Sequence, residues 1–182
     1  MADFYQKITE QRGSLDKIAR KIPGFKGYLE KEDRRAADRL LRERLVRAFE
    51  EQQTRFTRLQ RDLVDAGGLQ YMERVQRIDG LLQTFIDRVR TASSGYAGLT
   101  DPIKVRETEL ERLYAFDNAL LAYQDQFAAG LERLEQVIGT SEVGGVLRQL
   151  EDVVTEANNT FKRREEAMTG LLGGSEPPRH SE

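Results

Sequence analysis

The chain has 182 residues, of which 38% are hydrophobic and 33% charged, and its 29 basic and 31 acidic residues give a formal net charge of −2. This length suits one domain, and so charge-rich a composition favours a slim helical bundle in which each helix buries a single stripe. Charges of mixed sign along the chain argue against nucleic-acid binding, and the absence of cysteine excludes disulfides, thiolate nucleophiles and cysteine-ligated zinc.

The first predicted element is a short amphipathic helix over residues 3–22. Pro23 ends it, because the residue before a proline avoids the helical region. Five basic and three acidic residues lie along this helix. Its apolar face either packs against the rest of the chain or lies on a membrane surface or a partner. The residues of that face are Phe4, Ile8, Leu15 and Ile18.

A segment rich in glycine and aromatic residues, PGFKGY (Pro23 to Tyr28), follows this helix. Its proline and glycines suit a tight bend between helices, with the aromatic rings covering the end of a bundle. The alternative is a docking loop in which exposed aromatic rings beside a lysine bind a partner. A later loop, SSGYAGLTDP (Ser93 to Pro102), repeats the Gly-Tyr pair. The candidate interaction residues are therefore Phe25, Lys26, Tyr28 and Tyr96.

Four long helices are predicted, over residues 29–66, 69–92, 103–138 and 146–172. Each carries apolar residues at alternating spacings of three and four, which is the pattern of a coiled-coil seam. Breaks fall at Gly67-Gly68, in the loop from Ser93 to Pro102, and in GTSEVGG (Gly139 to Gly145). The composition of residues 173–182 predicts a disordered tail. Residues 1–172 are thus expected to form one domain.

The predicted fold class is all-α. Short connections place helices that follow each other in sequence side by side and antiparallel, so we expect an antiparallel bundle of four long helices. Coiled-coil-like seams would close its core. The buried positions expected in the last two helices include Leu113, Phe116, Leu120 and Phe127, and then Phe161 and Met168.

Two stretches, PGFKGYLEKEDRRAADRLLRERL and SSGYAGLTDPIKVRETELERLYAFDNALL, resemble a family of uncharacterised bacterial all-helical proteins. The resemblance covers most of the chain outside the tail. It implies an all-helical fold and brings no activity and no site residues with it.

Patterns that carry catalysis or metal binding are missing. The single histidine is His180 in the tail, and neither a phosphate-binding loop nor a nucleophile elbow occurs. Glu43, Glu51, Asp87 and Glu109 lie between seam positions, as solvated acids do. Asp117 lies closer to the seam, beside Phe116, and is expected either as a buried acid or as a flank residue paired with an arginine. We therefore predict no enzyme activity, no cofactor and no metal.

The favoured function is a non-catalytic protein-interaction or assembly scaffold, because long helices with charged faces offer mainly their surfaces, which can recognise a partner. A protein partner or self-association is expected, and nucleic acid is not. The alternative is a peripheral scaffold on a membrane surface, resembling phage-shock and ESCRT-III-type proteins in its N-terminal amphipathic helix. No apolar run reaches the length of a membrane span or a signal-peptide core, which predicts a cytoplasmic protein.

Overall fold

The computed structural model describes residues 13–27, 31–92 and 107–173. All regular structure in these ranges is helical, as the sequence predicted. The long helices are α2 (Lys31–Asp65), α3 (Met72–Thr91), α4 (Glu107–Val137) and α5 (Val143–Gly173), and a 3₁₀ turn, η1 (Leu69–Tyr71), precedes α3. Within the described residues, α3 and α4 are thus shorter than the helices predicted over 69–92 and 103–138. Residues 174–182 lie outside the described ranges.

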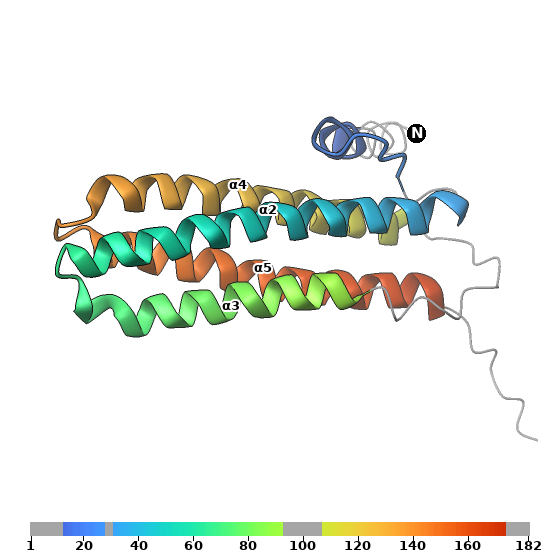
Figure 1. The fold of residues 1–182 in the computed structure, drawn as a ribbon. Coiled ribbons are helices and arrows are strands. Elements are labelled where there is room, and N and C mark those ends of the chain that lie inside the picture. Colours follow the sequence, from blue (N-terminus) through green and yellow to red (C-terminus); the bar gives the residue numbers. More distant parts are fainter. Residues whose placement is uncertain (1–12, 28–30, 93–106, 174–182) are drawn as a thin grey trace, which may run out of the picture.

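The four long helices lie side by side as two hairpins, α2 with α3 and α4 with α5 (Figure 1). Helix α2 packs against α3 and α4, and α5 packs against the same two helices. Helices α3 and α4 are neighbours in sequence but do not form one of these packed pairs. The order around the bundle is therefore α2, α3, α5, α4, with α3 and α4 on a diagonal.

This order makes the two hairpins dock with their helices parallel. Gln52 Nε2 of α2 donates to the carbonyl of Gln124 in α4 (3.0 Å), and Arg55 of α2 donates to Glu135 of α4 (2.7 Å). Residue numbers therefore rise together along this pair, and α3 and α5 also run the same way in Figure 1. Helices that follow each other in sequence run in opposite directions in Figure 1, whereas the packed pairs between the hairpins, α2 with α4 and α3 with α5, are parallel. The predicted bundle of antiparallel helices therefore does not describe the contacts between the hairpins.

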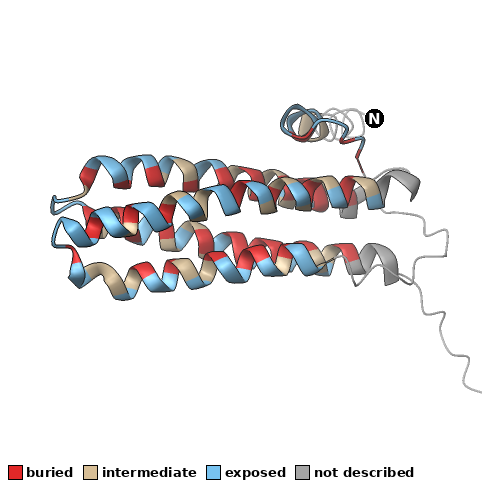
Figure 2. Cartoon of the chain, in the orientation of Figure 1, coloured by how far each residue is buried: buried red, intermediate tan, exposed pale blue. Residues whose placement is uncertain are grey.

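The apolar stripes face inward along the bundle, as the red bands of Figure 2 show. Near mid-length each long helix contributes one fully buried phenylalanine: Phe49, Phe85, Phe127 and Phe161. The ring of Phe49 lies 4.7 Å from that of Phe85 and 6.1 Å from that of Phe127, and Phe85 lies 6.0 Å from Phe161. We call these four residues the phenylalanine layer. Edge and tilted ring contacts of this kind add stabilisation beyond burial alone.

Helix α5 begins earlier than the glycine pattern predicted. The carbonyl of Glu142 accepts from the backbone N–H groups of Gly145 (3.0 Å) and Val146 (3.2 Å), so Gly144 and Gly145 lie inside the helix. Val143 at its first position is buried. The turn before it needs only Gly139, whose φ of 84° suits glycine. Burial of Val143 therefore extends the helix through residues of poor intrinsic propensity.

Residues 13–21 form a helix that lies crosswise over one end of the bundle (Figure 1). Its contacts are with α4: Asn118 donates to the carbonyl of Ser14 (3.3 Å), and Lys21 pairs with Asp125 (2.5 Å). The glycine-rich bend that follows is closely packed. A Cβ on Gly27, where φ is 94°, would lie 2.6 Å from the Tyr114 hydroxyl oxygen.

Candidate functional site

Some of the residues proposed from the sequence as interaction sites are buried, one is exposed, and the others lie outside the described residues. Phe25 is 5% exposed and belongs to the core, so it does not offer the exposed ring that a docking loop requires. Ile18 is fully buried and Leu15 packs partly buried against the same core, whereas Lys26 is exposed. Phe4, Ile8, Tyr28 and Tyr96 lie outside the described residues.

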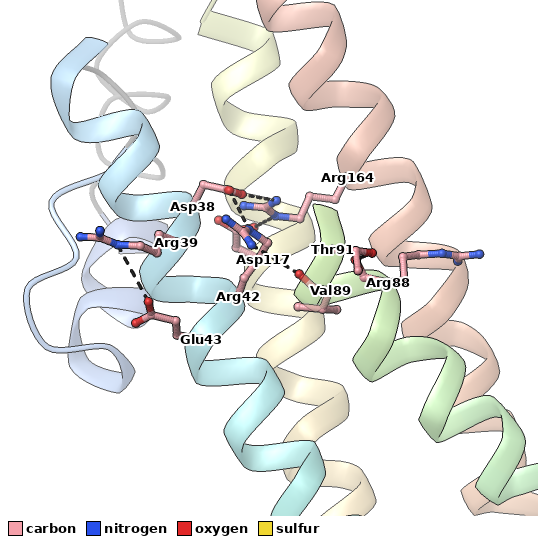
Figure 3. A network of polar contacts seen from close by, with 9 residues as sticks. All are labelled: Asp38, Arg39, Arg42, Glu43, Arg88, Val89, Thr91, Asp117 and Arg164. Carbon is pink, nitrogen blue, oxygen red and sulfur yellow. Dashed lines mark hydrogen bonds and ion pairs between the residues drawn. The ribbon is translucent and has the colours of Figure 1, made fainter. Parts of the chain in front are cut away.

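A network of charged side chains crosses the interior of the bundle (Figure 3). Arg164 of α5 is fully buried; its Nε donates to Asp117 of α4 (2.6 Å) and its Nη1 to Asp38 of α2 (2.8 Å). The second carboxylate oxygen of Asp38 accepts from Arg42 Nε (2.8 Å). Arg42 also reaches the carbonyl of Val89 in α3 (3.5 Å). The buried charge network, Asp38, Arg42, Asp117 and Arg164, thus touches all four long helices.

The network is electrically balanced, with two arginines and two aspartates. Asp117 is fully buried and Asp38 is 2% exposed, so desolvation of each charge must be offset by its partners. Arg164 also stacks its guanidinium 5.9 Å from the ring centre of Phe161, which adds a cation–π contact. Hydrogen bonds have short range and fixed direction. The network therefore specifies how far each helix can slide along its neighbours.

Asp117 was predicted from the sequence either as a buried acid or as a residue paired with an arginine, and it is both, whereas the inward position of Arg164 was not predicted. Arg164 lies between the buried Phe161 and Met168, and Asp117 lies between Leu113 and Leu120, where the seam requires an inward residue. The seam prediction placed Phe116 there instead, but Phe116 is only partly buried and Asp117 is the inward residue. A charged residue at an inward seam position is the sequence pattern that could have predicted the buried charge network.

A groove of about 530 Å³ opens beside the network, between α2 and α3. Arg42 belongs to the charge network and also lines this groove. Val46 contributes partly exposed apolar surface, while Val89 borders the groove but is fully buried. The remaining charged lining is three arginines and one glutamate: Arg39, Arg47, Arg90 and Glu43. We call this the arginine groove. Guanidinium groups match carboxylates in two-point hydrogen bonds, so its lining suits an acidic ligand.

Within the protein these arginines already meet acids. Arg90 pairs with Glu50 and contacts Asp87 (3.5 Å), and Arg39 lies 3.9 Å from Glu43. All of these pairs are largely exposed, and exposed pairs of this kind contribute little stability. An incoming carboxylate could therefore exchange with them at small cost.

The fold separates charges that alternate along the sequence. The phenylalanine layer divides the bundle into a network half, which contains the charge network and residues 13–27, and a turn half, which contains the glycine turns after α2 and α4. Among described side chains that are at least partly exposed, the network half carries 14 basic and seven acidic residues. The turn half carries seven basic and 12 acidic residues. Among the side chains that the structure describes, the network half is therefore basic and the turn half acidic.

The turn half also holds the large hydrophobic side chains that are most exposed in the described part of the chain. Leu69 is 67% exposed and Val64 is 41% exposed, at the turn between α2 and α3. Exposed acids Asp62 and Asp65 precede this turn, and Glu73 follows it. We call these five residues the acidic tip. It combines apolar and acidic groups, the complement of the arginine groove.

One titratable group beside the network has a shifted pKa. Burial raises the pKa of Glu165 above its ordinary value of 4.5, and the nearby positive charges of Arg88 and Arg164 only partly oppose this. In the ranges that the structure describes, no three His, Cys, Asp or Glu side chains gather in a way that could hold a metal ion. Nor does any described helix have the length and apolar character needed to cross a bilayer.

Comparisons with family models, with curated proteins and with solved structures return no match to this chain. The resemblance to uncharacterised bacterial helical proteins remains a prediction. The charge network, the arginine groove and the acidic tip are therefore the features of the molecule that bear on its function.

Proposed function

We propose that this chain is a non-catalytic protein-interaction and assembly module. The observation that carries the proposal is the separation of charge between the network half and the turn half, with a groove in the basic half. A partner with an acidic surface would be attracted to the basic half before contact, which raises association rates and rejects basic competitors.

The framework that we propose for this role is a single unit of two helical hairpins with coiled-coil-like seams, spanning residues 1–172. Its supports are the apolar stripes of the four helices and the charge network that joins both hairpins. Such a framework would hold the groove arginines of α2 and α3 in one arrangement, because Arg42 belongs to both network and groove. Rigid presentation lowers the entropy cost of binding.

Site-specific photo-crosslinking in cells tests the proposal. A photoreactive residue at Arg47, in the arginine groove, should yield protein adducts, and one at Arg148, exposed in the turn half, should yield fewer. Adding Arg39→Glu and Arg90→Glu to the Arg47 probe should abolish its adducts. If neither probe forms any protein adduct, the proposed function is wrong.

A second candidate is binding to an anionic membrane surface, favoured by the polar face of the helix at residues 13–21. Lys17, Arg20 and Lys21 are exposed there, while Ile18 is buried against the bundle. Insertion of the apolar face would require this helix to leave α4. We therefore infer that any membrane contact would be electrostatic and made by the docked helix.

Flotation with vesicles of phosphatidylserine and phosphatidylcholine tests this candidate. Binding should rise with the phosphatidylserine fraction and fall with salt, and Lys17→Glu with Arg20→Glu should remove it. Ile18→Ala, which leaves those charges in place, serves as the matched control. Binding that survives the loss of both charges and high salt would contradict this mode.

A further inference from the structure

We propose that the arginine groove receives the acidic tip of a second copy of this chain. The inference rests on the proposed assembly function and names its partner. It requires three things of the molecule: opposite charge on two surfaces, apolar surface on both, and positions that leave each surface open when the other is occupied.

The charges of the two surfaces are complementary. Arg39, Arg47 and Arg90 line the groove, and three acids, Asp62, Asp65 and Glu73, flank the turn at the tip. Within one molecule the two surfaces lie in opposite halves of the bundle, so they cannot meet. Between molecules the carboxylates of the tip would pair with these guanidinium groups, and Glu73 would exchange its exposed pair with Arg77 to do so.

The apolar parts of the two surfaces also correspond. Val46 is partly exposed in the groove, and Leu69 and Val64 are exposed at the tip. Seating Leu69 over Val46 would remove apolar surface from water on both copies, which is the source of affinity that charges alone supply poorly. The groove has a volume of about 530 Å³, into which the Leu69 side chain would project.

Because groove and tip are different surfaces, the contact is heterologous. Each copy that binds through its tip keeps an open groove, and growth continues unless the rotation closes a ring. The expected assembly is therefore open-ended, weakened by salt, and stopped by the loss of either surface.

Light scattering after size exclusion tests the inference on the purified full chain. At low salt the mass should rise above 20.9 kDa as concentration increases, and at high salt it should return to 20.9 kDa. A groove variant, Arg39→Glu with Arg47→Glu, and a tip variant, Asp65→Lys with Leu69→Lys, should each stay monomeric. A control variant, Arg58→Glu with Arg148→Glu, reverses two exposed arginines outside the groove and should still assemble.

Mixing the two monomeric variants gives the decisive result. The groove variant keeps a normal tip and the tip variant keeps a normal groove, so an equimolar mixture should form a dimer and grow no further. Circular dichroism checks that each variant remains helical, and Arg47→Glu alone replaces the groove variant if the pair unfolds.

Three results would overturn the inference: a wild-type chain that stays monomeric at every concentration, an assembly that neither variant disturbs, or variants that fail to combine. Its failure is distinguishable from failure of the proposed function. A monomeric chain whose Arg47 probe still crosslinks to another protein would keep the interaction module and eliminate self-docking.

Discussion

Both halves of the bundle have an apolar core, but among the described residues only the network half adds buried ion pairs to it. In the turn half the core is apolar, with residues such as Leu63, Ile78, Leu134 and Leu150 buried almost completely. In the network half a fully buried arginine and two buried aspartates join the helices. Apolar packing tolerates small shifts of one helix against another, whereas ion pairs with fixed hydrogen-bond directions do not.

The comparison indicates what each half contributes. We expect apolar burial to supply most of the stability in both halves, since apolar atoms need no partners of opposite charge. Our hypothesis is that the network contributes little net stability. Its role would be to fix the register between the helices that carry the groove residues. Substitutions that separate stability from register can test this division.

The largest effect is expected from Asp117→Ala in the network half. It leaves the buried Arg164 without one of its two carboxylates, and breaking a buried pair in this way costs about 3–5 kcal/mol. Urea denaturation followed by circular dichroism measures the loss in free energy of unfolding.

The matched control for this prediction removes Arg164 together with the charge of both its carboxylate partners. The variant Asp38→Asn, Asp117→Leu and Arg164→Met should recover most of the stability, because apolar residues of similar volume replace the buried Asp117–Arg164 pair well and the amide oxygen at position 38 can still accept from Arg42. A loss below about 1 kcal/mol for Asp117→Ala would contradict a buried, fully desolvated network.

A smaller loss is expected from Gly130→Ala in the turn half. The added Cβ would lie 2.5 Å from Leu150 Cδ2 and 3.2 Å from its Cγ, and Leu150 is itself buried. Overpacking of this kind costs about 1–3 kcal/mol, reduced by the better helix propensity of alanine. Thermal and urea unfolding should both show the loss, and an unchanged midpoint would mean that α4 and α5 separate easily.

Gly80→Ala should act in the opposite direction. This glycine lies inside α3, and a Cβ placed on it would have no heavy atom within 4 Å. Alanine should therefore stabilise the protein by about 0.5–1 kcal/mol through helix propensity alone. The same unfolding experiment serves as the measurement, and any destabilisation would show that this face of α3 is covered by a contact.

The smallest predicted effect concerns pH. Burial raises the folded-state pKa of Glu165 above 4.5, so its ionised form opposes folding. This cost is absent well below pH 4.5, grows as pH rises through the two pKa values, and is complete above the folded one. Glu165→Gln should raise the unfolding free energy at neutral pH by less than about 1 kcal/mol, since the group is partly exposed.

At pH 4 and below, the stability of Glu165→Gln should approach that of the parent, because the parent carboxyl is then protonated. Glu166→Gln, on the exposed neighbouring position, is the control for the removal of one negative charge from this part of α5. An equal gain at both pH values would assign the effect to packing instead of charge.

Periodicity and turn residues alone were enough to predict the all-helical fold and most of its buried stripe. Positions such as Phe49, Leu82 and Leu150 were predictable because helical spacing is local and needs no knowledge of the partner. The break at Gly67 was predictable for the same reason, since its φ of 82° is a property of one residue. The start of α5 was not, because burial of Val143 overrides local propensity.

Only the tertiary structure decided which charges meet. Arg164 bonds to residues 47 and 126 positions away, and helix periodicity says nothing about pairs at such separations. The parallel docking of the hairpins likewise depends on the order of helices around the bundle. The reversal of direction at each connection gathers described basic residues of distant segments at one end and described acidic residues at the other, although their signs alternate along the chain. The candidate site is thus a product of packing that no single segment encodes.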